Sequence, residues 1–183
     1  FPDLVTPDSP TQRISGKPLK EFKKIKHPER MLSFNDAFSE DDMKAWQERY
    51  EKVLPGGKKS GYYCELKIDG LAIELIYKNG VLEAGSTRGD GLIGEDVTQN
   101  LKTIEAIPLH LLDWEEVEKN IKKYDLEHFS KNLKKVLSGS FVVRGEVFIT
   151  RKEFENLNRQ QKKAGLKEHA NPRNLAAGSI RQL

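Results

Sequence analysis

An Asn79-Gly80 dipeptide between two apolar runs is the feature that most limits the fold this chain can adopt. Residues 71–77 precede the dipeptide and residues 81–86 follow it, and both runs have strand composition. A two-residue type I′ turn needs positive φ at both of its central residues, which asparagine and glycine tolerate better than other residues. The pattern therefore predicts a β-hairpin, and with it an antiparallel sheet, near the middle of the chain.

Two further segments, residues 64–69 and 141–149, have the two-residue period of a half-buried strand. In an extended chain, alternate side chains point to opposite faces. The charged side chains that then share a face are Glu65, Lys67 and Asp69 in the first segment and Arg144 and Glu146 in the second. Both segments are predicted to be strands, and Gly70 is predicted to allow a sharp turn after the first.

Helical patterns alternate irregularly with these strands. Capping residues and apolar periodicity predict helices over residues 39–54 and 150–165, and an apolar stripe predicts a surface helix over about 113–137. Residues 1–30 contain five prolines, which predicts an extended connector. Without regular β-α-β alternation, the fold class is α+β, with mostly antiparallel sheets flanked by helices.

Composition excludes several classes of protein. No apolar run approaches the roughly 18 residues of a membrane span, and no signal peptide opens the sequence. One cysteine, Cys64, excludes an internal disulfide framework, and with four scattered histidines it gives no ligand set for structural zinc. We therefore expect a cytoplasmic protein with no membrane partner and no metal ligands in this stretch.

The formal net charge of +3 hides an uneven distribution. Residues 13–30 contain seven basic and two acidic side chains, and residues 151–183 contain eight basic and three acidic ones, so the centre is acidic. Two basic flanks suit a polyanion such as nucleic acid, although on charge alone the simpler interpretation is a solvated surface.

Lys67 is the strongest candidate for catalysis. A neutral lysine amine can attack an electrophilic centre and form a covalent intermediate, which divides one difficult transfer into two steps. The commoner meaning of such a segment is a polar strand face with paired charges. Carboxylates at Glu65 and Asp69 would favour the ammonium form, so a nucleophilic Lys67 needs an opposing cation, such as magnesium bound with a nucleotide, or desolvation.

Two other side chains suit a nucleotide site, although neither a P-loop nor a convincing dinucleotide-binding glycine motif is present. Arg88 lies on the glycine-rich loop 87–91 and could clamp a phosphate, or it could simply be solvated. Glu146 could accept hydrogen bonds from ribose hydroxyls, or it could pair with Arg144 on the surface.

Taken together in their order along the chain, several motifs resemble a known family. Lys67-Ile68-Asp69-Gly70 resembles the lysine-x-aspartate-glycine signature of the covalent nucleotidyltransferases, which are DNA and RNA ligases and mRNA capping enzymes. The motifs that follow resemble the adenylation domain of bacterial NAD-dependent DNA ligases. They are residues 87–91, 94–98, 143–147 and 170–174. Residues 6–11 and 31–33 fit that family too, whereas residues 113–139 form a longer connector than usual.

This resemblance implies an activity and its partners. Lys67 would attack the adenylyl phosphorus of NAD, release nicotinamide mononucleotide and retain AMP on its amine. The AMP would then pass to the 5′-phosphate of a nick in double-stranded DNA, and the 3′-hydroxyl would displace it. The resemblance also implies magnesium as a cofactor, a monomer, and roles in DNA replication and repair.

The resemblance also assigns roles to individual residues. Glu65 matches the residue that reads adenine, Asp69 matches the motif aspartate needed for transfer, and Arg88 and Glu146 match nucleotide contacts. Ser33 and Phe34 match the lining of the adenylate pocket, where Phe34 replaces the commoner leucine. The positions expected near DNA or phosphate are Arg173 and Arg181.

The fold implied is an incomplete covalent nucleotidyltransferase fold. Residues 1–30 would be the connector from a preceding helical domain, and residues 31–183 the first part of the adenylation domain. Zinc is expected only beyond residue 183. We expect such a fragment to be inactive in sealing nicks alone. An ATP-dependent ligase or capping enzyme, and a catalytically silent nucleic-acid-binding module, remain as alternatives.

Overall fold

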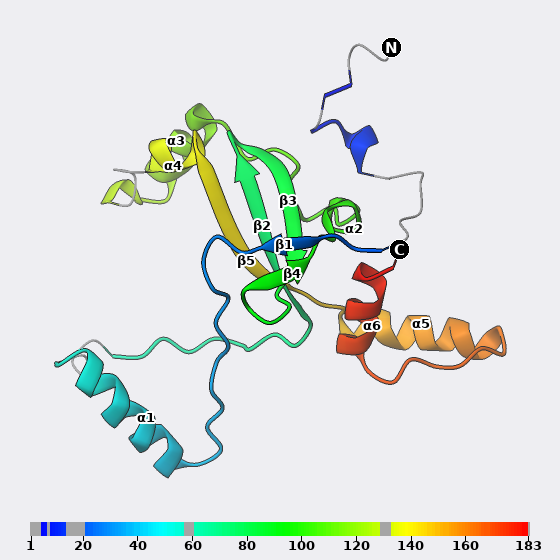
Figure 1. Cartoon of the computed structure of the whole chain (residues 1–183), viewed down its shortest axis with the longest axis horizontal. Coiled ribbons are helices and arrows are strands. Elements are labelled where there is room, and N and C mark those ends of the chain that lie inside the picture. The colour runs from blue at the N-terminus through cyan, green and yellow to red at the C-terminus, as the bar shows by residue number, and fades with distance from the viewer. Residues whose placement is uncertain (1–4, 7, 14–20, 57–60, 129–132, 183) are drawn as a thin grey trace. The chain divides into compact units, whose positions relative to one another are not determined.

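The computed structural model describes residues 5–6, 8–13, 21–56, 61–128 and 133–182 (Figure 1). The chain divides into two compact units. Unit 1 comprises Phe1–Met31 and Asp69–Leu183, and unit 2 comprises Leu32–Ile68. No helix among the described residues is both long and apolar enough to cross a membrane.

A three-stranded antiparallel sheet lies at the centre of unit 1, with the strand order β3-β2-β5 (Figure 1). These strands are β2 (Leu71–Lys78), β3 (Val81–Thr87) and β5 (Ser140–Val147). Asn79 and Gly80 have φ values of 50° and 80°, as a type I′ turn requires, so the predicted hairpin is confirmed. The predicted strand over residues 141–149 is confirmed as β5, which pairs along the other edge of β2.

A second, two-stranded sheet joins β1 (Lys24–Lys26) to β4 (Ile93–Glu95) in antiparallel register. The segment predicted to be a connector, residues 1–30, therefore contains a short strand. Pro28 follows β1 rather than interrupting it, so every residue of β1 keeps its backbone N–H. A 3-10 helix, η2 (Pro10–Gln12), lies earlier in the same segment.

The strand predicted over residues 64–69 is wrong, because this segment has no regular secondary structure. Among the described residues, all the strand pairings belong to other segments, so this one lacks the ladder that would stabilise an extended strand. Its apolar side chains are also exposed, with Leu66 86% and Ile68 41% accessible. Alternation alone therefore did not identify a buried face.

The hydrophobic core of unit 1 covers one face of the sheet. The short helix α2 (Thr98–Lys102) packs against β3, and its Leu101 is completely buried. Tyr77 of β2 is also buried, and its hydroxyl donates to the Pro108 carbonyl at 2.8 Å. The buried members of this cluster are Ile73, Leu75, Tyr77, Leu82, Val97, Leu101, Ile107, Leu109 and Ile180.

Side-chain caps begin the longer helices. Ser39 caps α1 (Glu40–Val53) and Thr150 caps α5 (Arg151–Lys163), which confirms two predicted helices. Asp113 caps α3 (Trp114–Lys123) and Asn171 caps α6 (Pro172–Ile180). Residues 113–137 do not form one helix, because Asp125 has a φ of 55° and α4 (Leu133–Leu137) is separate.

We predict that Leu101→Ala lowers the free energy of unfolding by about 2–5 kcal/mol, because it opens a cavity beside β3. Leu101 Cδ1 lies only 2.5 Å from where a Cβ on Gly85 would be, so this leucine fills the space over a glycine. Urea-induced unfolding measures the change. The control Leu112→Ala, at a side chain that is 53% exposed, should change stability by about 0.5 kcal/mol or less. Equal losses in the two variants would contradict this assignment of the core.

Candidate functional site

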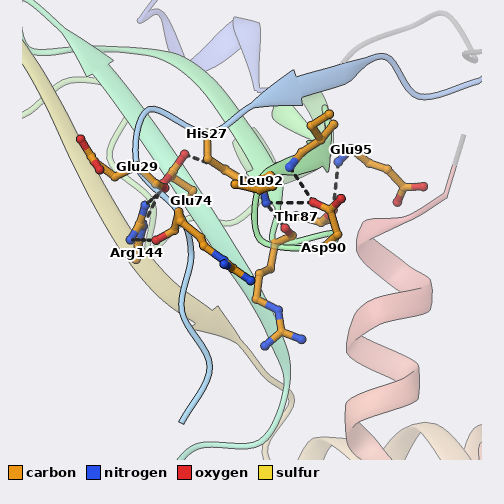
Figure 2. Close-up of polar contacts among 11 residues, drawn as sticks. His27, Glu29, Glu74, Thr87, Asp90, Leu92, Glu95 and Arg144 are labelled. Atoms are coloured by element: carbon orange, nitrogen blue, oxygen red, sulfur yellow. Dashed lines mark hydrogen bonds and ion pairs between the residues drawn. The ribbon is translucent and has the colours of Figure 1, made fainter.

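The loop between β3 and β4 is shaped by its own backbone and by one carboxylate (Figure 2). Asp90 Oδ1 accepts hydrogen bonds from the backbone N–H groups of Ile93 and Leu92, each at 2.8 Å. These bonds, that of Ile93 first, lower the pKa of the Asp90 carboxyl. The Gly91 N–H also donates to the Arg88 carbonyl at 2.9 Å. The loop therefore presents the half-buried Arg88 from a defined backbone.

Glycines allow the two ends of this loop to approach each other. A Cβ on Gly94 would lie 1.8 Å from the Thr87 carbonyl oxygen, and one on Gly89 would lie 1.9 Å from that of Ile93. Gly89 also has a φ of 54°, a backbone conformation that disfavours other residues. Thr87 Oγ1 closes the same region by accepting the Glu95 N–H at 3.0 Å.

A buried polar network beside the loop was missed by the sequence analysis (Figure 2). Glu74 on β2 accepts from Arg144 Nε at 2.9 Å and lies 2.9 Å from His27 Nδ1. The side chains of Glu74 and His27 have no exposed surface. A glutamate at the centre of the apolar run 71–77 was the available signal, since a carboxylate is rarely buried without a partner.

Glu146 and Arg144 do not pair with each other in the way that the simpler interpretation of β5 suggested. Glu146 Oε1 accepts the Gly70 N–H at 3.0 Å, whereas Arg144 binds Glu74. Gly70 is buried, and a Cβ on it would lie 2.1 Å from the Val147 carbonyl oxygen. The last residue of the Lys67–Gly70 motif is thus fixed at the start of β2.

The two arginines expected near phosphate both pair with carboxylates in unit 1. Arg181 donates to both carboxylate oxygens of Glu95, at 2.6 and 3.0 Å, and Arg173 Nη1 lies 3.4 Å from Asp69 Oδ1. The bond from Arg181 is the main cause that lowers the pKa of Glu95. The Asp69–Arg173 pair is more open, since its side chains are 67% and 60% exposed.

Ser33, Phe34, Glu65 and Lys67 belong to unit 2, and all four are exposed. Within this unit, the Trp46 ring of α1 stacks on Tyr50 at 5.6 Å and contacts Tyr62 at 5.9 Å between ring centroids. Tyr62 therefore holds the segment that leads to Lys67 against α1. Among the described residues, no ion pair joins Glu65 to Lys67. The Glu65 carboxylate therefore does not contact Lys67, although a shared strand face predicted that the two side chains would be neighbours.

A pocket of about 200 Å³ also lies in unit 2. It is lined by the segment 35–37 and by α1 side chains that include Asp42, Trp46 and Arg49. Among the described residues, no group of three or more histidine, cysteine, aspartate or glutamate side chains is arranged to hold a metal ion. The Asp42 carboxylate at this pocket instead accepts hydrogen bonds from the Phe38 N–H at 3.0 Å and the Ser39 hydroxyl at 2.9 Å.

Comparison with known proteins identifies similar sequences along the whole chain. The family model of the NAD-dependent DNA ligase adenylation domain matches residues 19–122 and 112–183. A protein named DNA ligase from Acetivibrio thermocellus is 50% identical over 182 residues, and one from Geotalea daltonii is 48% identical over 185. Each alignment covers 100% of this chain but 24% of the relative, so the chain spans about a quarter of their length.

We predict that Gly94→Ala destabilises unit 1 by about 1–3 kcal/mol, because the new Cβ would overlap the Thr87 carbonyl and separate the ends of the loop. Denaturant unfolding measures the loss. Gly178→Ala on α6 is the matched control. A Cβ there meets nothing within 4 Å, and helix propensity favours alanine by about 0.5–1 kcal/mol. A neutral Gly94→Ala would contradict the close contact.

We predict that Arg181→Gln raises the pKa of Glu95 towards its ordinary value, because the strongest stabilising partner of the carboxylate is lost. Since folding lowers this pKa, the pair stabilises the fold above the ordinary glutamate pKa, and the effect is lost as the pH falls through the lowered value. Carboxyl-carbon NMR titration measures the shift. Lys24→Gln, which removes a partner 3.6 Å away, should have a smaller effect. An equal or larger shift in that control would overturn this order of causes.

Proposed function

The chain belongs to the NAD-dependent DNA ligase adenylation domain family, and from this premise we propose that Lys67 is its nucleophile and carries AMP during the reaction. One structural observation supports this proposal most directly. The Lys67–Gly70 motif leads from an exposed segment into a buried glycine that Glu146 holds at the start of β2. The reactive amine is therefore accessible, while the backbone three residues away is fixed.

In the proposed reaction, the neutral amine of Lys67 attacks the adenylyl phosphorus of NAD. A phosphorus–nitrogen bond forms and the phosphorus–oxygen bond to nicotinamide mononucleotide breaks, while the amine proton passes to solvent. The AMP then moves to the 5′-phosphate of a DNA nick, and the 3′-hydroxyl displaces it. Because the chain spans a quarter of its relatives' length, nick sealing is proposed for the complete protein.

The roles of the surrounding residues follow from the same proposal. Glu65 reads the adenine, Ser33 and Phe34 line its pocket, and Arg88 and Glu146 contact the nucleotide. Arg88 is supported for this role by the shaped loop that presents it. Asp69 contributes to transfer of the adenylyl group. Arg173 and Arg181 contact DNA phosphates, in competition with the carboxylates that bind them in this structure.

We also propose residues 31–183 as the first part of a covalent nucleotidyltransferase domain and residues 1–30 as its connector. The α+β class and the antiparallel sheets are compatible with that fold. Magnesium would bind mainly through substrate phosphate oxygens, since the described residues provide no acidic cluster for it. Zinc would bind beyond residue 183, because this chain has a single cysteine. The complete protein would act as a cytoplasmic monomer on nicked duplex DNA in replication and repair.

We predict that the complete protein chain, incubated with NAD and magnesium, gains the mass of one AMP on Lys67. Lys67→Ala should abolish the adduct and leave the circular-dichroism spectrum unchanged, because the side chain is exposed. Intact-protein mass spectrometry and peptide mapping measure both results. Lys78→Ala, which removes an exposed lysine on β2, is the matched control and should retain the adduct.

Two results would contradict the proposal. An adduct that forms with ATP and not with NAD would indicate the ATP-dependent class of ligases. A wild-type protein that binds nucleic acid but gains no AMP from either nucleotide would indicate a catalytically silent module.

A further inference from the structure

We propose that His27 is a positioning residue for the nucleotide site, because its ring joins the buried Glu74 carboxylate to the backbone carbonyl of Arg88. This inference rests on the proposed role of Arg88 as a nucleotide contact. His27 does not itself contact the nucleotide in this proposal. It sets the affinity for NAD by fixing the backbone that carries the Arg88 side chain.

The two ring nitrogens of His27 face two different oxygen acceptors (Figure 2). Nδ1 lies 2.9 Å from Glu74 Oε1, and Nε2 lies 3.0 Å from the Arg88 carbonyl oxygen. A carbonyl oxygen only accepts, and the Glu74 carboxylate also accepts from Arg144 Nε. Nε2 must therefore carry a proton and donate it to the Arg88 carbonyl, while Nδ1 lies against the buried carboxyl group of Glu74.

Because the His27 and Glu74 side chains are buried, each depends on the other as a hydrogen-bond partner. The side chains of His27 and Glu74 are both 0% exposed, so no bulk water replaces a lost partner. An unpaired charge at such a position is strongly unfavourable, and the ring is therefore held in one orientation. Glu74 is itself on the central strand β2, so the His27 ring is held by a residue of the sheet rather than by a loop.

The same residue also holds the other end of the loop. The His27 backbone N–H donates to the Leu92 carbonyl at 2.9 Å, while its ring donates to the carbonyl of Arg88. The Arg88 N–H donates in turn to the Ala72 carbonyl of β2 at 3.1 Å. The peptide groups on both sides of the Arg88 Cα are thus bonded, and one of these bonds depends on a side chain.

A second set of bonds connects this network to the chain segment that precedes Ser33. Arg144 donates from Nη1 to the Arg30 carbonyl at 3.2 Å and from Nη2 to the Glu29 carbonyl. The Met31 N–H donates to the Gly91 carbonyl at 2.9 Å. Residues 27–31 and 88–92 are therefore held together, and His27 contributes the side-chain bond that reaches Arg88.

Two conservative substitutions separate the two bonds of the ring. An asparagine amide nitrogen reaches about as far as Nδ1, so His27→Asn keeps the donor to Glu74 and removes the donor to Arg88. A glutamine amide nitrogen reaches about as far as Nε2, so His27→Gln keeps the donor to Arg88. Because both variants remain polar and similar in volume, a purely structural role predicts similar effects on activity.

The test measures the rate of AMP addition to Lys67 in the complete protein as a function of NAD concentration. For His27→Asn we expect KM for NAD to rise on the order of tenfold with kcat nearly unchanged, because ground-state binding is weakened. His27→Gln should restore KM most of the way to the wild-type value. His110→Asn and His110→Gln, at an exposed histidine, are the matched controls and should leave KM unchanged. Equal values of KM in the two His27 variants would overturn the proposal.

A readout that does not depend on activity completes the test. Nitrogen-15 NMR should show a proton on Nε2 of His27 in the wild-type protein. The Gly91 amide, which donates to the Arg88 carbonyl, should exchange with solvent faster in His27→Asn than in His27→Gln. A wild-type protein without an AMP adduct would contradict the proposed function, and the Gly91 exchange rates would then decide the positioning role alone. Equal exchange in the two variants, or a His27 Nε2 without a proton, would overturn it.

Discussion

The buried carboxylate of Glu74 is the group on which the arrangement of unit 1 around the candidate site depends. A carboxylate without exposed surface costs several kcal/mol unless opposite charges and hydrogen bonds offset the loss of water. Arg144 donates to Glu74 from β5, and the His27 ring contacts it from the segment after β1. Balancing one charge on the central strand therefore brings three segments together, although they are distant in sequence.

This requirement explains why the proline-rich beginning of the chain belongs to unit 1. The backbone N–H groups of His27 and Met31 donate to carbonyls of the loop between β3 and β4, and Arg144 donates to the carbonyls of Glu29 and Arg30. Without those residues, Glu74 would lose His27, and the Arg88 carbonyl would lose a donor. A boundary at residue 30 reflects the change in proline content, but hydrogen bonds join residues 27–30 to residues that follow this boundary.

The sequence predicted the elements whose cause is local, whereas two-residue alternation, whose outcome depends on a distant partner strand, was right for β5 and wrong for residues 64–69. The Asn79-Gly80 hairpin and the helices capped by Ser39 and Thr150 depend on residues within a few positions, and all three are confirmed. The strand over residues 64–69 needed a neighbouring strand, which alternation cannot reveal. Glu74 was visible as an anomaly in an apolar run, but its partner His27 was not, because no local pattern relates the two.

The two arginines expected near phosphate are both paired with carboxylates, and the motifs in the sequence do not reveal this. On the proposed function, a DNA phosphate must take Arg173 from Asp69 and Arg181 from Glu95. The first pair has one contact at 3.4 Å and is mostly exposed, so exchanging its carboxylate for a phosphate costs little. The second pair is bidentate and Glu95 is 19% exposed, so its exchange costs more. On that proposal, Arg173 would be the arginine more readily available to DNA, and Arg181 would contribute once its bonds to Glu95 have broken.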